Sequence, residues 1–298
     1  MRSTVLLIAA ALPFVVEGEQ KQQQPPPADS KEEKRHRFPD AIIIGVKKGG
    51  TRALLEYLRI NPLVKSPGPE VHFFDRHYDR GLDWYRRQMP IVGPEEVVVE
   101  KTPSYFITKE SPERIRQWNP DVKFLVVVRD PVTRAISDYA QTASKRPRMP
   151  SFERMAFVVN SSSGLPEVNS SWGAVRIGLY ARWTRRWLAH FPLEQFHFVY
   201  GERLITNPVK EVRLAENFLG LRPFVRRRHF NMTASEKGFP CLVRKKPDET
   251  TPGIHCLGKT KGRTHPTVSP EALERLRAFY APRNEEFFKL IGRRFQWG

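Results

Sequence analysis

The chain has 298 residues, and its 50 lysines and arginines against 32 aspartates and glutamates give a formal net charge of +18. A surplus of this size indicates a polyanionic partner: nucleic acid, an anionic membrane or a sulfated polysaccharide. A signal-like N-terminus argues against nucleic acid, and basic residues scattered through loops, without an amphipathic basic helix, argue against extended membrane contact.

The first 18 residues are typical of a secretory targeting segment. Arg2 precedes an apolar run over residues 5–16, and Val16 and Gly18 offer small residues for cleavage. Because the run is short for a bilayer, we predict a cleaved signal peptide over residues 1–18, with an uncleaved signal anchor as the alternative. In both cases the rest of the chain enters the secretory pathway.

Residues 19–37 are predicted to form a disordered stem. They are rich in Gln, Pro and charge and show no apolar periodicity, so they cannot bury enough surface to fold. The remaining residues, 38–298, show no internal repeat and are enough to form the core of one α/β domain.

A buried strand and a helix are predicted on either side of a glycine-rich turn. The apolar run 41–44 is typical of a parallel strand, and from Thr51 apolar residues recur at helical spacing. At such a turn, the helix N-terminus presents free backbone N–H groups and the positive end of the helix dipole. Both features favour the binding of phosphate or sulfate.

The turn differs from the nucleotide-binding pattern GxxxxGK[ST] in one respect. Both glycines, Gly45 and Gly50, and the hydroxyl residue Thr51 are present, but no lysine lies between the last two. The lysines of this turn, Lys47 and Lys48, lie inside the loop instead. An ordinary strand–helix turn with solvated lysines is the alternative.

The segment EVHFFDR, residues 70–76, follows a loop punctuated by Pro and Gly at 61–68. Its carboxylates, imidazole and phenylalanines form a mixture typical of a substrate cleft. If the segment is extended, Glu70 and His72 share one face. A solvated loop anchored by its two phenylalanines is the alternative.

A second buried strand is predicted at residues 97–100, directly before KTPS. Because the carboxyl ends of parallel strands face the ligand crevice, Lys101, Thr102 and Ser104 should project toward the site that contains Lys48. A surface lysine is the alternative interpretation of Lys101.

The clearest strand is FLVVV, residues 124–128, and a helix is predicted from Pro131. Arg129 at the strand end is placed to make a forked contact with a phosphate, and Ser137 lies about two turns into the helix. An ion pair between Arg129 and an acidic neighbour such as Asp130 is the alternative.

The last third of the chain contains scaffold elements and a second basic turn. A strand at 195–200 and helices at 208–219 and 270–292 are predicted, the last one broken near Pro282. Between them, Lys261, Gly262, Arg263 and Thr264 can wrap a nucleotide phosphate from the far side.

Cysteine and asparagine residues agree with an oxidising compartment. The simplest assignment of Cys241 and Cys256 is one disulfide, worth about 3 kcal/mol, with two buried free thiols as the alternative. Their spacing matches no zinc pattern. Asn160, Asn169 and Asn231 each open an N-x-S or N-x-T triplet, a candidate glycosylation site.

Five segments together resemble one family, the heparan sulfate glucosamine 3-O-sulfotransferases. They are GVKKGGTR, EVHFFDR, KTPSYF, VVVRDPVTRAISDY and KGRTHP, and they occur in this order between residues 38 and 298. The resemblance implies a single domain with a central parallel sheet flanked by helices, related to the P-loop nucleotide-binding fold. It also implies sulfuryl transfer from 3′-phosphoadenylyl sulfate to the 3-hydroxyl of glucosamine in heparan sulfate, in the Golgi lumen.

The resemblance assigns roles to the residues of these segments. Glu70 is the expected general base, Lys48 stabilises the leaving phosphate with assistance from Lys101, and His72 and Asp75 orient the base or the sugar. The expected donor-binding residues are Lys48, Gly49, Gly50, Thr51, Arg52, Arg129, Ser137, Lys261, Gly262, Arg263, Thr264 and His265. The expected acceptor-binding residues are Glu70, Val71, His72, Phe73, Phe74, Asp75, Arg76, Lys101, Thr102, Pro103, Ser104, Gln141, Lys145, Trp172 and Gly173.

No metal is expected, because a sulfuryl group carries less charge than a phosphoryl group and lysines can take the role of Mg²⁺. Three alternatives remain open. They are a sulfotransferase for another position or another glycosaminoglycan, a lumenal nucleotide-dependent kinase, and a non-catalytic heparin-binding protein.

Overall fold

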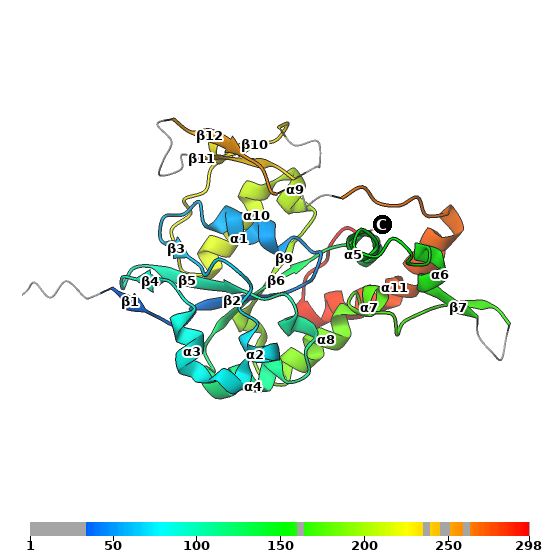
Figure 1. Ribbon diagram of the computed structural model, residues 1–298, viewed down its shortest axis with the longest axis horizontal. Coiled ribbons are helices and arrows are strands. Elements are labelled where there is room, and N and C mark those ends of the chain that lie inside the picture. Colours follow the sequence, from blue (N-terminus) through cyan, green and yellow to red (C-terminus); the bar gives the residue numbers. More distant parts are fainter. Residues whose placement is uncertain (1–33, 160–163, 235–238, 245–250, 259–262, 298) are drawn as a thin grey trace, which may run out of the picture. The chain divides into compact units, whose positions relative to one another are not determined.

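The computed structural model describes residues 34–159, 164–234, 239–244, 251–258 and 263–297 (Figure 1). The described chain from Lys34 onward forms one compact unit. The predicted signal segment, most of the stem, Asn160, Lys261 and Gly262 lie outside the described residues. Within these ranges no helix is both long enough and apolar enough to cross a membrane.

A sheet of five parallel strands forms the centre of the unit, with the order β3-β5-β2-β6-β9. The strands are β2 (Ala41–Gly45), β3 (Val64–Lys65), β5 (Val97–Lys101), β6 (Lys123–Val128) and β9 (Phe196–Tyr200). Four of them confirm the predicted apolar runs, and β3 was not predicted. The predicted parallel α/β fold is confirmed.

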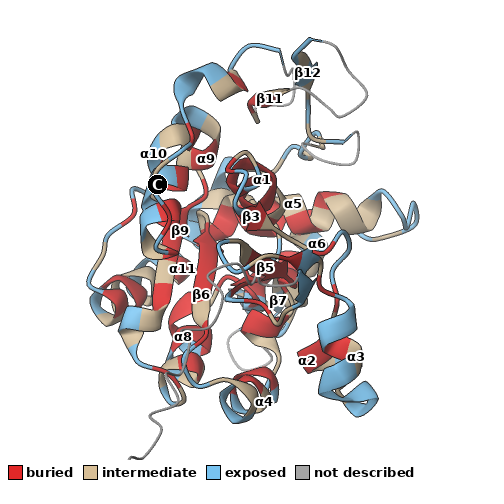
Figure 2. Cartoon of the chain, turned by 90° about the vertical axis from the view of Figure 1, so that its left-hand side faces the viewer, coloured by how far each residue is buried: buried red, intermediate tan, exposed pale blue. Residues whose placement is uncertain are grey.

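Helices cover both faces of the sheet (Figure 1). Ile43, Leu125 and Val127 point to one face and pack with α1 (Thr51–Leu58) and α10 (Pro208–Phe218). Their sequence neighbours pack on the opposite face against α2 (Phe73–Arg76), α3 (Gly81–Arg87), α4 (Ser111–Trp118), α8 (Tyr180–Leu188) and α11 (Pro270–Ile291). Because both faces are covered, the strands are mostly apolar, and β6 is buried from Phe124 to Val128, shown in red in Figure 2.

Smaller elements complete the unit. Asp130 caps α5 (Pro131–Ala143) by accepting the Thr133 N–H at 2.6 Å, and Pro131 occupies the first turn as predicted. The other short helices are α6 (Phe152–Ala156), α7 (Gly173–Arg176) and α9 (Arg203–Thr206), with 3₁₀ turns at Tyr78–Arg80, Tyr105–Ile107, Leu193–Gln195 and Arg227–His229. Two antiparallel sheets join β7 (Phe157–Val159) to β8 (Pro166–Val168), and β10 (Phe230–Asn231) to β11 (Cys241–Arg244) and β12 (Gly253–His255).

The folded part begins before Phe38. Residues of β1 (Arg35–His36) pair antiparallel with β4 (Ile91–Val92), and an Arg37 Nη2 lies 3.0 Å from Asp40 Oδ1. The composition of residues 34–37 resembles the stem, but their pairing partner lies more than fifty residues downstream and could not be recognised locally.

The closing helix α11 is not broken at Pro282, contrary to the prediction. Both halves are anchored by packing, with Leu276 and Tyr280 buried before the proline and Phe287 and Ile291 after it. The Tyr280 hydroxyl also donates to the Val175 carbonyl at 2.8 Å. Tertiary packing on both sides therefore outweighs the loss of one helical hydrogen bond.

The predicted disulfide is confirmed. Cys241 and Cys256 are bonded, which ties β11 to the residue that follows β12.

Candidate active site

A cleft of about 770 Å³ opens at the carboxyl ends of the parallel strands. Strands β3 and β5 lie on one side of β2, and β6 and β9 on the other, so the loops that follow them diverge at this point. The lining residues are Lys47, Lys48, Gly50, Thr51, Arg52, Ala53, Glu70, His72, Arg76, Pro103, Ser104, Ile107, Arg129, Ser137, Gln141, Ile177, Ile205, Phe239, Leu257, Arg263 and His265.

The glycine-rich turn forms the floor of the cleft. A Cβ at Gly49 would lie 2.3 Å from the Val127 carbonyl oxygen, and one at Gly201 would lie 2.5 Å from the Gly49 carbonyl oxygen. Only glycine at these two positions lets the turn pack directly on the end of β6. Lys48 and Gly50 have φ values of 70° and 118°, in the left-handed region. Helix α1 begins directly after Gly50, at Thr51.

The two lysines of the turn have different surroundings. Lys47 Nζ lies 2.8 Å from Asp138 Oδ1, and the same carboxylate lies 3.2 Å from Arg134 Nη1. Burial raises the pKa of Asp138, but Arg134 and Lys47 outweigh burial and hold the pKa below its usual range. Lys47 therefore fastens the turn to α5, and both Lys47 and Lys48 line the cleft.

Arg134 was missed in the sequence. Its side chain is fully buried and donates to the carbonyl oxygens of Lys47 and Ala174. The sequence feature that could have indicated this role is the spacing of four residues between Arg134 and Asp138 on one helix. The same spacing also occurs on solvated helix faces, so it does not identify a buried pair.

A second group of side chains surrounds Glu70 on the other side of the cleft. Lys101 Nζ donates to Glu70 Oε1, and His72 Nε2 lies 3.4 Å from Glu70 Oε2. His72 Nδ1 lies 3.0 Å from Asp75 Oδ2, which also accepts the Ser104 hydroxyl at 2.6 Å. The predicted KTPS and EVHFFDR segments thus meet in one network that orients an exposed carboxylate toward the cleft.

The backbone that carries His72 has a left-handed φ of 54° and leads into the one-turn helix α2, instead of the extended conformation considered for this segment. The His72 N–H donates to Thr102 Oγ1 at 3.3 Å, and the Thr102 hydroxyl donates to Glu100 Oε1 at 2.5 Å. Burial raises the pKa of the Glu100 carboxyl to about 7, although the Thr102 hydroxyl and Lys101 oppose the shift.

Glu100→Gln is expected to flatten the dependence of stability on pH. The folded protein holds the Glu100 proton to a higher pH than the unfolded chain does, so rising pH favours unfolding between the two pKa values. Between about pH 5 and pH 8, release of the Glu100 proton should lower the free energy of unfolding of the wild type by about 2 kcal/mol. The variant should lack this decrease. Urea unfolding across this range measures it, with Glu110→Gln as an exposed control. Identical slopes for wild type and Glu100→Gln would contradict the assignment.

Basic groups converge at the side of the cleft formed by the glycine-rich turn and the end of β6. Arg129 Nε lies 3.9 Å from Glu202 Oε1, so its acidic partner is this residue from the segment after β9, not Asp130. The pKa of His265 is lowered by burial and then by the positive charges of Arg129 and Lys48. Lys48, Arg129 and His265 come from three separate segments and line the same cleft, where the positive charge of Lys48 and Arg129 favours an anion.

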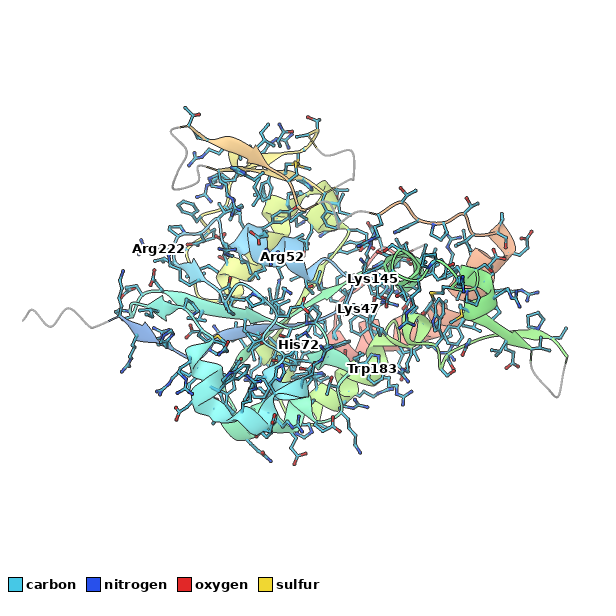
Figure 3. All side chains as sticks on the ribbon, viewed as in Figure 1. Lys47, Arg52, His72, Lys145, Trp183 and Arg222 are labelled. Atoms are coloured by element: carbon cyan, nitrogen blue, oxygen red, sulfur yellow. A yellow bond between two sulfur atoms is a disulfide. The ribbon has the colours of Figure 1, made fainter. Side chains whose placement is uncertain are left out.

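Some predicted residues do not line this cleft. Phe73 and Phe74 are fully buried, and Phe73 stacks on Tyr85 with ring centroids 4.5 Å apart, so their side chains belong to the core. Other predicted residues outside the lining are Gly49, Val71, Asp75, Lys101, Thr102, Lys145, Trp172, Gly173 and Thr264. Of these, Lys101 lines an adjoining hollow of about 490 Å³, which shares Glu70 and Arg52 with the cleft. Figure 3 labels Lys47, Arg52, His72 and Lys145 in this region.

The apolar part of the lining was also missed. Ile205, Phe239 and Leu257 come from separate segments, and no local pattern connects them. Within the described ranges, no group of three or more His, Cys, Asp or Glu is arranged to hold a metal ion.

The chain is similar to known sulfotransferases over most of its length. A family model described as a sulfotransferase domain matches residues 38–289. The chain is 54% identical over 266 residues to heparan sulfate glucosamine 3-O-sulfotransferase 3A1 of Mus musculus, covering 89% of this chain and 66% of that relative, slightly less than two thirds of its length. Heparan sulfate glucosamine 3-O-sulfotransferase 5 of Homo sapiens is 43% identical over 283 residues, with 90% and 78% covered.

Among solved structures, a sulfotransferase from Alicyclobacillus acidocaldarius matches with a TM-score of 0.64 and 24% sequence identity, over 87% of this chain and 98% of that one. This likeness concerns the fold alone.

Proposed function

Because the chain belongs to the heparan sulfate glucosamine 3-O-sulfotransferase family, we propose that it moves a sulfuryl group from 3′-phosphoadenylyl sulfate to the 3-hydroxyl of glucosamine residues in heparan sulfate. The observation that supports this most directly is one cleft that contains both a glycine turn at a helix N-terminus and an oriented carboxylate.

The donor half of the cleft suits a sulfated nucleotide. The N-terminus of α1 and the side chain of Lys48 offer positive charge and N–H donors to the phosphate that becomes the leaving group. Arg129 and Ser137 are the proposed contacts of the 3′-phosphate. The apolar side chains of Phe239 and Leu257 on the same wall suit the planar base.

The acceptor half supplies the acid–base chemistry. Glu70 takes the proton from the sugar hydroxyl as the hydroxyl oxygen attacks sulfur, and the bond between sulfur and the phosphate oxygen breaks. Lys48 stabilises the charge that develops on that oxygen. The contacts of Lys101 and His72 with the Glu70 carboxylate fix its direction, and Asp75 and Ser104 hold His72.

The proposed location is the Golgi lumen, in agreement with the disulfide and with the family. Two of the candidate glycosylation triplets lie within the described residues. Asn169 Nδ2 already donates to the Met155 carbonyl at 3.1 Å, whereas Asn231 uses only its Oδ1, as acceptor from Thr233 and Ala234. Asn231 is therefore the more accessible acceptor for a glycan.

Disaccharide analysis of heparan sulfate after incubation with the protein and radiolabelled donor tests the proposal. We expect label on the 3-hydroxyl of glucosamine. Label at another position would support the alternative regiochemistry, and an absence of label with retained heparin binding would support a non-catalytic protein.

A further inference from the structure

A surface remote from the cleft has an unusual charge distribution. It consists of the outer face of α10 and the loop that follows, and we call it the α10 surface. Its members are the six exposed cations Lys210, Arg213, Arg222, Arg226, Arg227 and Arg228. Segment 207–229 also contains two carboxylates, Glu211 and Glu216, and both are fully buried. The exposed charge of this segment is therefore entirely positive.

Both carboxylates are engaged by groups inside the protein. Glu211 accepts the Tyr200 N–H at 3.0 Å and lies 3.5 Å from Arg203 Nη1 and 3.6 Å from Arg293 Nη2. None of these partners belongs to the α10 surface. The two acids of α10 thus do not neutralise its outward-facing cations.

Glu216 fixes the loop that carries most of the cations. Its carboxylate accepts the Phe224 N–H at 3.1 Å, the Val225 N–H at 3.4 Å and an Asn61 Nδ2–H at 3.0 Å. The following turn is closed by the Arg226 N–H, which donates to His229 Nδ1 at 3.1 Å. Because the backbone is already held, binding through these arginines requires little ordering of the loop.

The two parts of the surface meet at a shallow hollow of about 410 Å³. Lys210, Arg213 and Asn217 from α10 line it together with Pro223 from the loop. None of these residues lines the catalytic cleft. Figure 3 shows Arg222 well away from Lys47 and His72.

The exposed face of α11 provides a contrast. Arg275 and Arg277 are exposed there as well, but Glu271 and Glu274 are exposed beside them in the sequence. Mixed charge of this kind is typical of an ordinary solvated helix. The α10 surface lacks this mixture.

We propose that the α10 surface is a second binding site for sulfated polysaccharide, which holds a part of the acceptor chain distant from the reacting glucosamine. The inference rests on the proposed function for the identity of the polymer. Five of the six cations are arginines, whose planar guanidinium groups make forked contacts with tetrahedral oxyanions. Sulfates spaced along one flexible polymer can reach cations spread over a helix, a hollow and a loop, which a single small anion cannot.

Engagement of both sites by one chain raises the local concentration of acceptor at the cleft. The gain applies only to chains long enough to span from the cleft to the α10 surface. A short oligosaccharide occupies the cleft alone and gains nothing.

The test compares long and short acceptors in the full chain. The variant R227E/R228E is expected to raise the KM for polymeric heparan sulfate on the order of tenfold, with kcat and the KM for a hexasaccharide unchanged. The control R275E/R277E reverses the same number of charges on the mixed face of α11, and should leave both KM values unchanged. Elution from immobilised heparin should require less salt for the first variant than for the control.

Equal effects on polymer and hexasaccharide, or equal effects of the two variants, would overturn the inference. So would a loss of binding to phosphatidylserine vesicles with unchanged heparan sulfate binding, which would assign the surface to an anionic membrane. If the wild type transfers no sulfate, the proposed function fails, and the salt of elution still decides whether the α10 surface binds the polymer.

Discussion

Replacing Glu70 by Gln is expected to remove turnover and leave both substrates bound. The amide keeps the size of the side chain but cannot take the proton of the sugar hydroxyl, a role worth roughly 10²- to 10⁴-fold in rate. We expect kcat to fall by this factor, with little change in the dissociation constants of 3′-phosphoadenosine 5′-phosphate and of heparan sulfate. Single-turnover kinetics and calorimetry measure the two quantities separately.

Glu110→Gln is the matched control, because Glu110 is exposed and does not line the cleft. It should retain wild-type kcat. Near-normal sulfate transfer by Glu70→Gln would remove this carboxylate from the mechanism.

Replacing Lys48 by Ala is expected to weaken the use of the donor. Lys48 lines the cleft shortly before the N-terminus of α1, and in the proposed mechanism it stabilises charge on the departing phosphate. Loss of one such group costs on the order of 10²-fold in kcat/KM for the donor. Initial rates with radiolabelled donor at saturating acceptor give this constant.

The exposed Lys109, outside the cleft lining, provides the control K109A, which should keep the wild-type constant. Unchanged donor kinetics in K48A would contradict the role of the glycine turn. Lys47 is unsuitable as a control, because it is tied to Asp138.

The strands that build the sheet could be predicted because they are buried on both faces. Runs such as residues 41–44 and 124–128 are apolar at every position, and their lengths are typical of strands. The two-residue strands β1 and β3 leave no such pattern, since each exists only through a distant pairing partner. The continuity of α11 through Pro282 also depends on packing that the local sequence does not show.

For the site, the parallel sheet explains why residues at strand ends could be placed near the crevice from the sequence. Arg129 directly follows β6 and lines the cleft, and Lys101, the last residue of β5, contacts Glu70 at its edge. In EVHFFDR, by contrast, the sequence does not tell which side chains turn inward. The left-handed backbone at His72 directs Phe73 and Phe74 into the core and leaves His72 beside Glu70.

Because of the strand order, different segments of the chain line the two halves of the cleft. Loops after β2, β6 and β9, with residues from the C-terminal third of the chain, line the proposed donor half of the cleft, whereas the segments after β3 and β5 carry Glu70, His72 and Ser104. We therefore expect exchanges of the cleft-lining residues in segments 66–76 and 102–107 to alter acceptor binding and to leave the proposed donor half unchanged. A change in acceptor preference therefore need not be accompanied by a change in the proposed nucleotide donor.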